Sequence, residues 1–275
     1  MFIQTEGVIF MAKTKIILGP PGTGKTHTLL NRVEEELARG TPPDRIAFLA
    51  FTKKAATEAR DRAMKKFDLE EQHLPYFRTL HSFAFHQLGL TKSEVMSRDF
   101  TDMIELYIES GPVPKLDVVF IDEAQDLCAL QWRMVDKISQ NANKIYVCGD
   151  DDQAIYTWAG ADVKHFIKLP GEIEILKQSY RCSKVIQNLS HKIINRVKFR
   201  RAKQWEGTDK NGSVVYHNYP EGVNLKEPGS WLVLARTNYM LDEIERDIRL
   251  QGMLYKRNNK LPVSTKLLNA VDAWK

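Results

Sequence analysis

Gly19-Pro-Pro-Gly-Thr-Gly24-Lys25-Thr26 is the stretch that decides the fold of this chain. It has every fixed position of a phosphate-binding loop, and it lies between an apolar run, Lys15–Leu18, and an amphipathic stretch, Thr26–Arg39. Glycines let backbone N–H groups approach phosphate oxygens, and the helix start adds the positive end of its dipole. The sequence therefore predicts a strand, a P-loop and a helix in succession.

The chain on either side of this loop alternates apolar runs with amphipathic stretches. Further strands are predicted over Ile46–Phe51, Leu116–Ile121 and Lys144–Cys148, with a helix over Lys53–Phe67. This alternation is typical of parallel strands joined by helices. We expect an α/β fold with a parallel sheet in residues 1–171, because Pro170-Gly171 is the best candidate for a domain boundary.

Beyond that boundary the pattern starts again. Strands are predicted over Glu172–Leu176, Ser213–His217 and Trp231–Ala235, followed by a helix over Tyr239–Gln251. The basic stretch Lys198–Lys203 has two interpretations, a nucleic-acid patch or a solvated helix end.

Bulk composition limits the class of protein. The chain has 275 residues, 43% hydrophobic and 27% charged, which is ordinary for a globular protein of one or two domains. No apolar run approaches the roughly 20 residues that span a bilayer, and the first residues do not have the pattern of a signal peptide. Three scattered cysteines predict a reduced, cytoplasmic setting without a zinc site. The net charge of +5 is compatible with a polyanionic partner but does not require one.

The nucleotide site is predicted from two segments. Its phosphate-binding residues are Gly19, Pro20, Pro21, Gly22, Thr23, Gly24, Lys25 and Thr26. Lys25 can reach the β- and γ-phosphates, and Thr26 can bind Mg²⁺. Asp122, at the end of an apolar strand, is the second metal candidate, and Glu123 beside it is the candidate general base. The expected cofactors are ATP and Mg²⁺.

A second informative segment is Val147–Gly160. Here an acidic strand end is followed at once by Gln153, Tyr156 and Trp158, so one segment could touch both a phosphate and a stacked base. Taken alone, Gln153 is equally well a turn residue facing solvent. Arg181 is either an arginine finger or half of a surface salt bridge, and Tyr180 either stacks on a base or fills a core.

These segments together resemble a superfamily 1 DNA helicase of the UvrD/Rep/PcrA type. The family's motifs appear in order: motif I at Gly19–Thr26, Ia at Ala50–Ala56, Ib at Thr79–Phe83, II at Ile121–Asp126, III at Gly149–Ala161 and IV at Gln178–Arg181. The resemblance implies a RecA-like first domain over residues 1–171 and part of a second RecA-like domain over residues 172–275. It also implies only a reduced accessory insertion near residues 84–116.

The resemblance also implies roles by position. Bases would stack on Phe51, Tyr156 and Trp158, and the nucleic-acid backbone would contact Thr52, His81 and Ser82. The γ-phosphate would be sensed by Gln153 and Arg181, adenine would stack on Tyr180, and Gln125 and Asp126 would couple the two sites. Single-stranded DNA is the implied partner, with other repair or replication proteins as further candidates, and the implied polarity is 3′ to 5′.

The sequence departs from the family in two ways that bear on activity. The adenine-binding motif near the start is not matched, although Gln4 lies at a suitable distance from Gly19. Segments resembling motifs V and VI are not present before Lys275, so we expect Mg-ATP binding with weak hydrolysis. Two alternatives stay open: an RNA-directed ATPase of the same superfamily, and a non-translocating ATP-binding switch or recruitment module.

Overall fold

A computed structural model of the chain describes residues 12–91, 99–218, 223–225, 227, 229–258 and 260–261. Contacts between residues divide the chain into two units, Met1–Ser213 and Val214–Lys275. The first contains a central sheet, and the second contains helix α9 (Asn238–Leu250). Gln4, the adenine candidate, lies outside the described residues.

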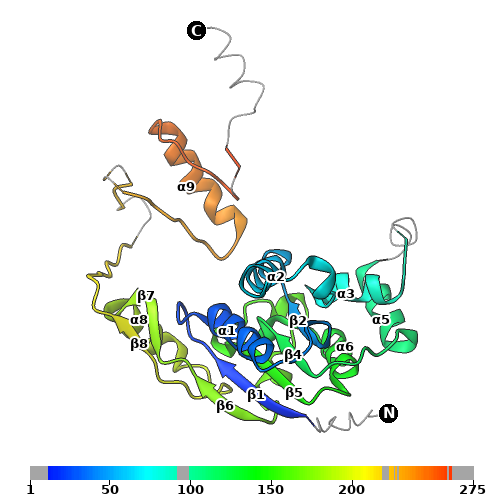
Figure 1. Cartoon of the computed structure of the whole chain (residues 1–275). Coiled ribbons are helices and arrows are strands. Elements are labelled where there is room, and N and C mark those ends of the chain that lie inside the picture. Colours follow the sequence, from blue (N-terminus) through cyan, green and yellow to red (C-terminus); the bar gives the residue numbers. More distant parts are fainter. Residues whose placement is uncertain are drawn as a thin grey trace, which may run out of the picture. The chain divides into compact units, whose positions relative to one another are not determined.

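Six parallel strands form the central sheet of the first unit (Figure 1). They are β1 Lys13–Leu18, β2 Ile46–Ala50, β3 Phe77–Thr79, β4 Val118–Ile121, β5 Lys144–Gly149 and β6 Glu172–Ile175. Their spatial order is β3-β2-β4-β5-β1-β6, and every adjacent pair is parallel. This is the RecA-like α/β sheet that the sequence predicts.

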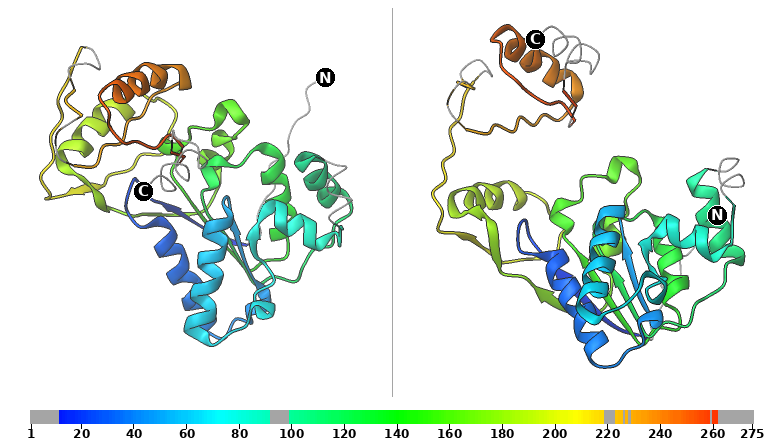
Figure 2. Two further views of the ribbon diagram at one scale, coloured as in Figure 1. Left: turned by 90° about the horizontal axis from the view of Figure 1, so that it is seen from above. Right: turned by 45° about the horizontal axis from the view of Figure 1, so that its top comes forward.

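Helices cover both faces of this sheet. The first unit contains α1 Lys25–Ala38, α2 Lys53–Phe67, α3 Leu80–Gln87, α5 Phe100–Ser110, α6 Ala129–Ser139, α7 Val163–Lys168 and α8 Lys184–Ile194. Successive strand residues point to opposite faces. Ile17 belongs to a buried cluster with Leu29 of α1 and Ala59 of α2, whereas Ile16 belongs to a cluster with Phe83 of α3 and Trp132 of α6. Figures 1 and 2 show α1 and α2 side by side on their face.

The predicted accessory insertion is integrated into the core. In the described part of residues 84–116, α5 contributes Met103, Ile104 and Tyr107 to the same buried cluster as Phe83. The Tyr107 hydroxyl donates to the carbonyl oxygen of Pro112 at 3.0 Å. This segment is therefore part of the layer that covers the sheet.

A small second sheet follows the main one. Strand β7 (Gln178–Ser183) pairs in parallel with β8 (Glu206–Thr208), and α8 lies between them in the chain. Strand β6 precedes it and pairs with β1, so residues 172–175 complete the main sheet. The contacts divide the chain after Ser213 and not after residue 171. That residues 172–275 form part of a second RecA-like domain stays a prediction.

The second unit differs from its predicted elements. The helix expected over Tyr239–Gln251 is present as α9, one residue earlier at each end. The strands expected over Ser213–His217 and Trp231–Ala235 are wrong, since both stretches are irregular. Leu232 and Leu234 are each 81% exposed. An apolar run becomes a strand only where a neighbouring strand takes up its backbone hydrogen bonds, and within the described residues neither run has such a neighbour.

Parallel strands bring the predicted motifs to one edge of the sheet. The segments after β3, β2, β4, β5 and β1 carry motifs Ib, Ia, II, III and I. Ligands of open α/β sheets bind outside the carboxyl ends of the strands. The order of the strands therefore sets the order of the motifs along this edge.

Candidate nucleotide site and aromatic surface

The loop after β1 has the conformation that a phosphate cradle requires. Gly22 and Gly24 have φ angles of 73° and 80°, a left-handed region that favours glycine. Gly24 is the N-cap of α1 and no side chain caps this helix, so the first N–H groups of α1, which have no acceptor within the helix, lie where the loop ends. The Thr23 hydroxyl donates to the Pro20 carbonyl at 2.8 Å, and the Lys25 ammonium donates to the Gly19 carbonyl at 3.0 Å. The basic side chain is therefore folded over the loop.

The two predicted metal residues meet across the sheet. The Thr26 hydroxyl donates to Oδ2 of Asp122 at 3.1 Å, although β5 separates β1 from β4. Asp122 is 1% exposed, and burial together with the charge of Glu123 raises its pKa to about 6. A hydroxyl and a carboxylate beside a phosphate loop are the oxygen ligands that Mg²⁺ takes, so the donor set fits the ion.

Glu123 lies in a strained backbone conformation next to this pair. Its φ angle is 52°, a left-handed value that is uncommon for a residue other than glycine. The Gln125 amide donates to Oε2 of Glu123 at 2.9 Å and to Oδ2 of Asp126 at 3.1 Å. Burial and the charge of Glu123 raise the pKa of Asp126 to about 6. Strain of this kind persists where neighbouring contacts hold it, and it is frequent at functional sites.

Gln153 approaches the phosphate loop from the segment after β5. Its amide nitrogen lies 3.5 Å from the Gly19 carbonyl oxygen and donates to Oδ2 of Asp150 at 2.5 Å. The Asp150 backbone N–H in turn donates to the Gln125 amide oxygen at 3.0 Å. Gln153 thus lies at the loop, and one glutamine, Gln125, connects the segments that follow β4 and β5.

Strand β7 docks on the phosphate loop. The Ser179 hydroxyl donates to the Pro21 carbonyl at 2.7 Å, and the Tyr180 N–H donates to the Gly22 carbonyl at 2.8 Å. A Cβ atom on Gly22 would lie only 2.4 Å from Cβ of Arg181, so glycine is required there for close approach. Arg181 is exposed and Tyr180 is 70% exposed, which leaves both side chains accessible beside the loop. Sequence reasoning missed Ser179, whose burial gives no local signal.

Three exposed aromatic residues gather at the same edge. The rings of Phe51 and Tyr156 stack with centroids 6.1 Å apart and planes at 27°. Phe51 and Tyr156 are each 40% exposed and Trp158 is 83% exposed. Apolar side chains that gather into an exposed patch often mark an interaction site. We call Phe51, Tyr156 and Trp158 the aromatic surface.

The predicted backbone-contacting residues lie on adjacent segments. Thr52 caps α2, with its side-chain oxygen accepting the Ala55 N–H at 3.2 Å. His81 and Ser82 are in the first turn of α3, directly after β3, and β3 neighbours β2. Burial lowers the pKa of His81, which favours its neutral form. All three share an edge of the sheet with Phe51.

Three basic residues of the stretch Lys198–Lys203 fit neither of the two interpretations given for it. Arg200 and Lys203 pair with acidic residues of the segment after β5, and Arg201 donates to the Leu169 carbonyl at 2.6 Å. Lys203 is 7% exposed. Protein groups satisfy these charges, so the interpretations as a nucleic-acid patch and as a solvated helix end both fail for these three residues.

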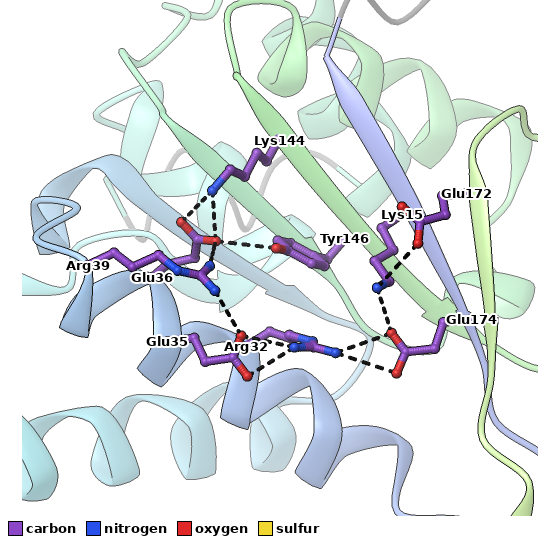
Figure 3. A network of polar contacts seen from close by, with 9 residues as sticks. All are labelled: Lys15, Arg32, Glu35, Glu36, Arg39, Lys144, Tyr146, Glu172 and Glu174. Carbon is purple, nitrogen blue, oxygen red and sulfur yellow. Dashed lines mark hydrogen bonds and ion pairs between the residues drawn. The ribbon is translucent and has the colours of Figure 1, made fainter.

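A network of charged side chains holds α1 against the sheet (Figure 3). Glu36, whose side chain is 2% exposed, accepts hydrogen bonds from Lys144 at 3.0 Å and from the Tyr146 hydroxyl at 3.2 Å. Burial opposes the Glu36 charge, but Lys144 and Arg39 together lower its pKa below the ordinary value. On β6, the strand at the end of the sheet beside β1, Glu174 pairs with Lys15 of β1 at 2.9 Å and with Arg32 of α1 at 3.3 Å. The helix that follows the loop is therefore anchored by these contacts to β5 and β6.

A family model described as an AAA domain, AAA_19, matches residues 4–159 of the 275 in the chain. The matched range includes the phosphate loop, the segment after β4 and the aromatic surface. The chain belongs to this AAA domain family. Among the described residues, no helix combines the length and apolar character that crossing a membrane requires.

Curated relatives of this AAA domain protein are DNA helicases. The probable DNA helicase II homolog of Mycoplasma capricolum is 31% identical over 145 residues, 51% of this chain. The ATP-dependent DNA helicase PcrA of Bacillus subtilis is 28% identical over 204 residues, 63% of this chain. The resemblance to UvrD/Rep/PcrA-type helicases is thereby confirmed. The chain spans only 19% and 27% of the length of these two relatives.

The comparison with solved structures gives weaker matches. The Pif1 helicase from Candida albicans has a TM-score of 0.37 at 18% identity and covers 62% of this chain and 37% of its own. A DNA replication initiation factor has a TM-score of 0.28 at 16% identity and covers 60% of this chain and 40% of its own.

Proposed function

We propose that this chain is the ATP-binding part of a DNA helicase or translocase that couples Mg-ATP to single-stranded DNA. One observation carries the proposal: the segment after β5 touches the phosphate loop through Gln153 and forms the aromatic surface through Tyr156, three positions later. A nucleotide-dependent shift of Gln153 would move an aromatic ring in the same segment.

The residues at the loop have complementary roles in this proposal. Lys25 and the N–H groups of the loop bind the phosphates, and Thr26 and Asp122 hold Mg²⁺. Glu123, held by Gln125, accepts a proton from the attacking water. Mg²⁺, when bound, supplies positive charge that stabilises the charge developing on the phosphate. Gln153 and Arg181 contact the γ-phosphate, and Tyr180 offers a ring for the adenine base.

The aromatic surface suits a single strand. Stacking on an aromatic ring contributes about 1–3 kcal/mol per base and accepts any base, as a translocase requires. Thr52, His81 and Ser82, at the same edge of the sheet, contact the backbone of the strand in this proposal. Because the relatives are named as DNA helicases, we assign DNA as the strand. The 3′-to-5′ movement that we infer for the whole protein rests on the resemblance to UvrD/Rep/PcrA-type helicases alone. The cytoplasmic location and repair or replication partners stay predictions.

The decisive experiment measures ATP hydrolysis with and without poly(dT), for the unmodified chain and for Trp158→Ala. Stimulation by poly(dT) that Trp158→Ala abolishes would support coupling through the aromatic surface. Equal stimulation by poly(U) would favour an RNA-directed ATPase, since stacking does not distinguish the sugars. ATP binding with no stimulation by either polymer would favour an ATP-binding switch.

A further inference from the structure

The acidic run Asp150-Asp151-Asp152, directly after β5, is closed by one buried lysine. The Lys203 ammonium lies 2.9 Å from Oδ1 of Asp150 and 3.1 Å from Oδ2 of Asp152, and it also bonds Asp151. The side chains of Lys203 and Asp150 are each 1% exposed. Burial opposes the ammonium charge, but Asp150 and Asp151 raise the pKa of Lys203 above its ordinary value. The lysine is therefore charged inside the protein.

This lysine occupies the position that a cation would take. One ligand atom from each of the three aspartates lies within 4.8 Å of the others, which is a spacing that can hold a metal. Because Lys203 bonds all three, the cluster already has its counter-charge. In this structure the three acids are the partners of a lysine.

Two further contacts fasten the same segment to the acidic run. Arg200 bonds both oxygens of Asp152, at 2.7 Å and 2.5 Å, and the Arg201 N–H donates to Oδ2 of Asp151 at 2.8 Å. Paired bonds from a guanidinium to a carboxylate fix geometry as well as charge. Residues 200–203 are thus clamped to the segment that carries Gln153.

Asp150 connects residues 200–203 to Gln153. One oxygen of Asp150 faces Lys203, and the other accepts from the Gln153 amide at 2.5 Å. The Asp150 N–H bonds Gln125, which also holds Glu123. A change at Lys203 would therefore alter the position of Gln153 without touching it.

On the C-terminal side of Lys203, the chain continues into a strand that pairs with β7. Residues 206–208 form β8, which pairs with β7, and the Glu206 N–H donates to the Lys177 carbonyl at 2.7 Å. Strand β7 carries Arg181 and rests on the phosphate loop through Ser179. Lys203 thus lies between the two segments that carry the γ-phosphate candidates Gln153 and Arg181.

We propose that Lys203 is a positioning residue that sets Gln153 at the phosphate loop and ties it to the strand of Arg181. This inference rests on the proposed ATP-dependent function. If Lys203 has this role, its loss should lower the turnover number and weaken the preference for ATP over ADP. The affinity for ADP itself should change little.

The test is a double-mutant cycle of Lys203→Met and Gln153→Ala in the whole chain. Each variant is assayed for kcat, for KM, and for affinity for ATP and ADP by competition with a fluorescent nucleotide. We expect Lys203→Met to lower kcat about 10-fold or more, the scale of a lost orienting partner, and to bring the ATP and ADP affinities together. The double variant should be no worse than Gln153→Ala alone, because effects acting through one residue are not additive.

Two controls separate positioning from stability. Lys198→Met removes an exposed lysine of the same stretch and should change neither kcat nor the ATP-to-ADP ratio. Lys203→Arg keeps the buried charge with another shape, and it replaces Lys203→Met in the cycle if that variant does not fold. It should preserve ADP affinity while reducing the preference for ATP.

The outcomes are distinguishable. Fully additive losses in a folded protein, or an unchanged ATP-to-ADP ratio, would overturn the positioning role while leaving the proposed function standing. If the unmodified chain binds no ATP, the proposed function fails first and the inference fails with it. If hydrolysis is too slow to measure, the affinity ratio alone decides.

Discussion

The ring of Tyr156 lies against the ring of Phe51, with centroids 6.1 Å apart, although the two residues follow strands that are not neighbours. Phe51 follows β2 and Tyr156 follows β5, with β4 between them. The segment after β5 therefore extends across the end of β4, where Asp122 and Glu123 lie. One short segment after β5 therefore connects Gln153, a candidate nucleotide-binding residue, to the aromatic surface.

Removal of the exposed rings should weaken binding of single-stranded DNA. We expect Trp158→Ala and Tyr156→Ala each to cost about 1–3 kcal/mol in affinity for oligo(dT), the value of one lost stacked base. Fluorescence anisotropy with a labelled oligonucleotide measures this. Phe199→Ala, a 49% exposed ring outside the aromatic surface, should leave affinity unchanged. Equal losses in all three variants would mean that general destabilisation, not stacking, explains the effect.

Substitution of the candidate base should separate binding from hydrolysis. Glu123→Gln keeps a side-chain oxygen that can still accept from the Gln125 amide but removes the negative charge that takes up a proton, so we expect a fall in kcat of about 10²–10⁴-fold. ATP affinity should change little, because Glu123 is assigned to the water and not to the phosphates. Phosphate release and nucleotide titration measure the two effects, with Glu58→Gln on the exposed face of α2 as the control. A Glu123→Gln variant with unaltered kcat would remove Glu123 from the proposed site.

A methyl group on Gly22 should displace β7 from the phosphate loop. Gly22→Ala combines a left-handed φ of 73° with a Cβ that would lie 2.4 Å from Cβ of Arg181. Gly40→Ala has a similar φ of 88° but meets nothing within 4 Å, so it reports backbone strain alone, about 1–2 kcal/mol. We expect Gly22→Ala to be the more destabilising in thermal unfolding.

Amide hydrogen exchange locates that effect. The Tyr180 N–H, bonded to the Gly22 carbonyl at 2.8 Å, should exchange faster in Gly22→Ala and not in Gly40→Ala. Identical exchange at Tyr180 in both variants would show that β7 does not depend on close approach at Gly22.

The network around Glu36 should make stability depend on acid pH. The Glu36 pKa is lower in the folded protein than its ordinary value of 4.5, so its contribution is fully present above about 4.5. That contribution is lost as the pH falls through the lower, folded pKa. Glu36→Gln should remove it and destabilise the fold by about 1–3 kcal/mol at pH 7, the value of hydrogen bonds to a charged group.

Urea unfolding at several pH values between 3 and 7 tests this. The difference between the unmodified chain and Glu36→Gln should start to shrink below about pH 4.5, where the carboxylate of the unfolded chain becomes protonated, and should be lost as the pH falls through the lower, folded pKa. Glu172→Gln, whose side chain is 76% exposed and pairs with Lys15 at 3.6 Å, should show almost no effect. A constant difference across this range would contradict a charge-dependent role for Glu36.

The local sequence pattern was enough to predict those helices and strands that have a clear apolar or amphipathic period. The phosphate loop, the strands β1, β2, β4 and β5 and the helix α2 lie where the apolar runs and amphipathic stretches predict them. Strand β3 was missed because three residues, Phe77–Thr79, are too few for a period to be visible. The strands expected within residues 213–235 failed for the opposite reason, because a clear apolar run found no partner strand.

The sequence by itself predicted the residue types of the candidate site: a glycine-rich loop with Lys25 and Thr26, an Asp122-Glu123 pair and three aromatic residues. Each follows from residue type and short spacing, which the backbone expresses locally. Only the tertiary structure decided which charges are free and which are paired. The sequence predicted that Lys203 is solvated or binds nucleic acid. In the structure it is buried against three carboxylates that lie 51 to 53 positions away in the chain. Pairing between distant segments depends on how the sheet orders its strands, and no local pattern encodes that order.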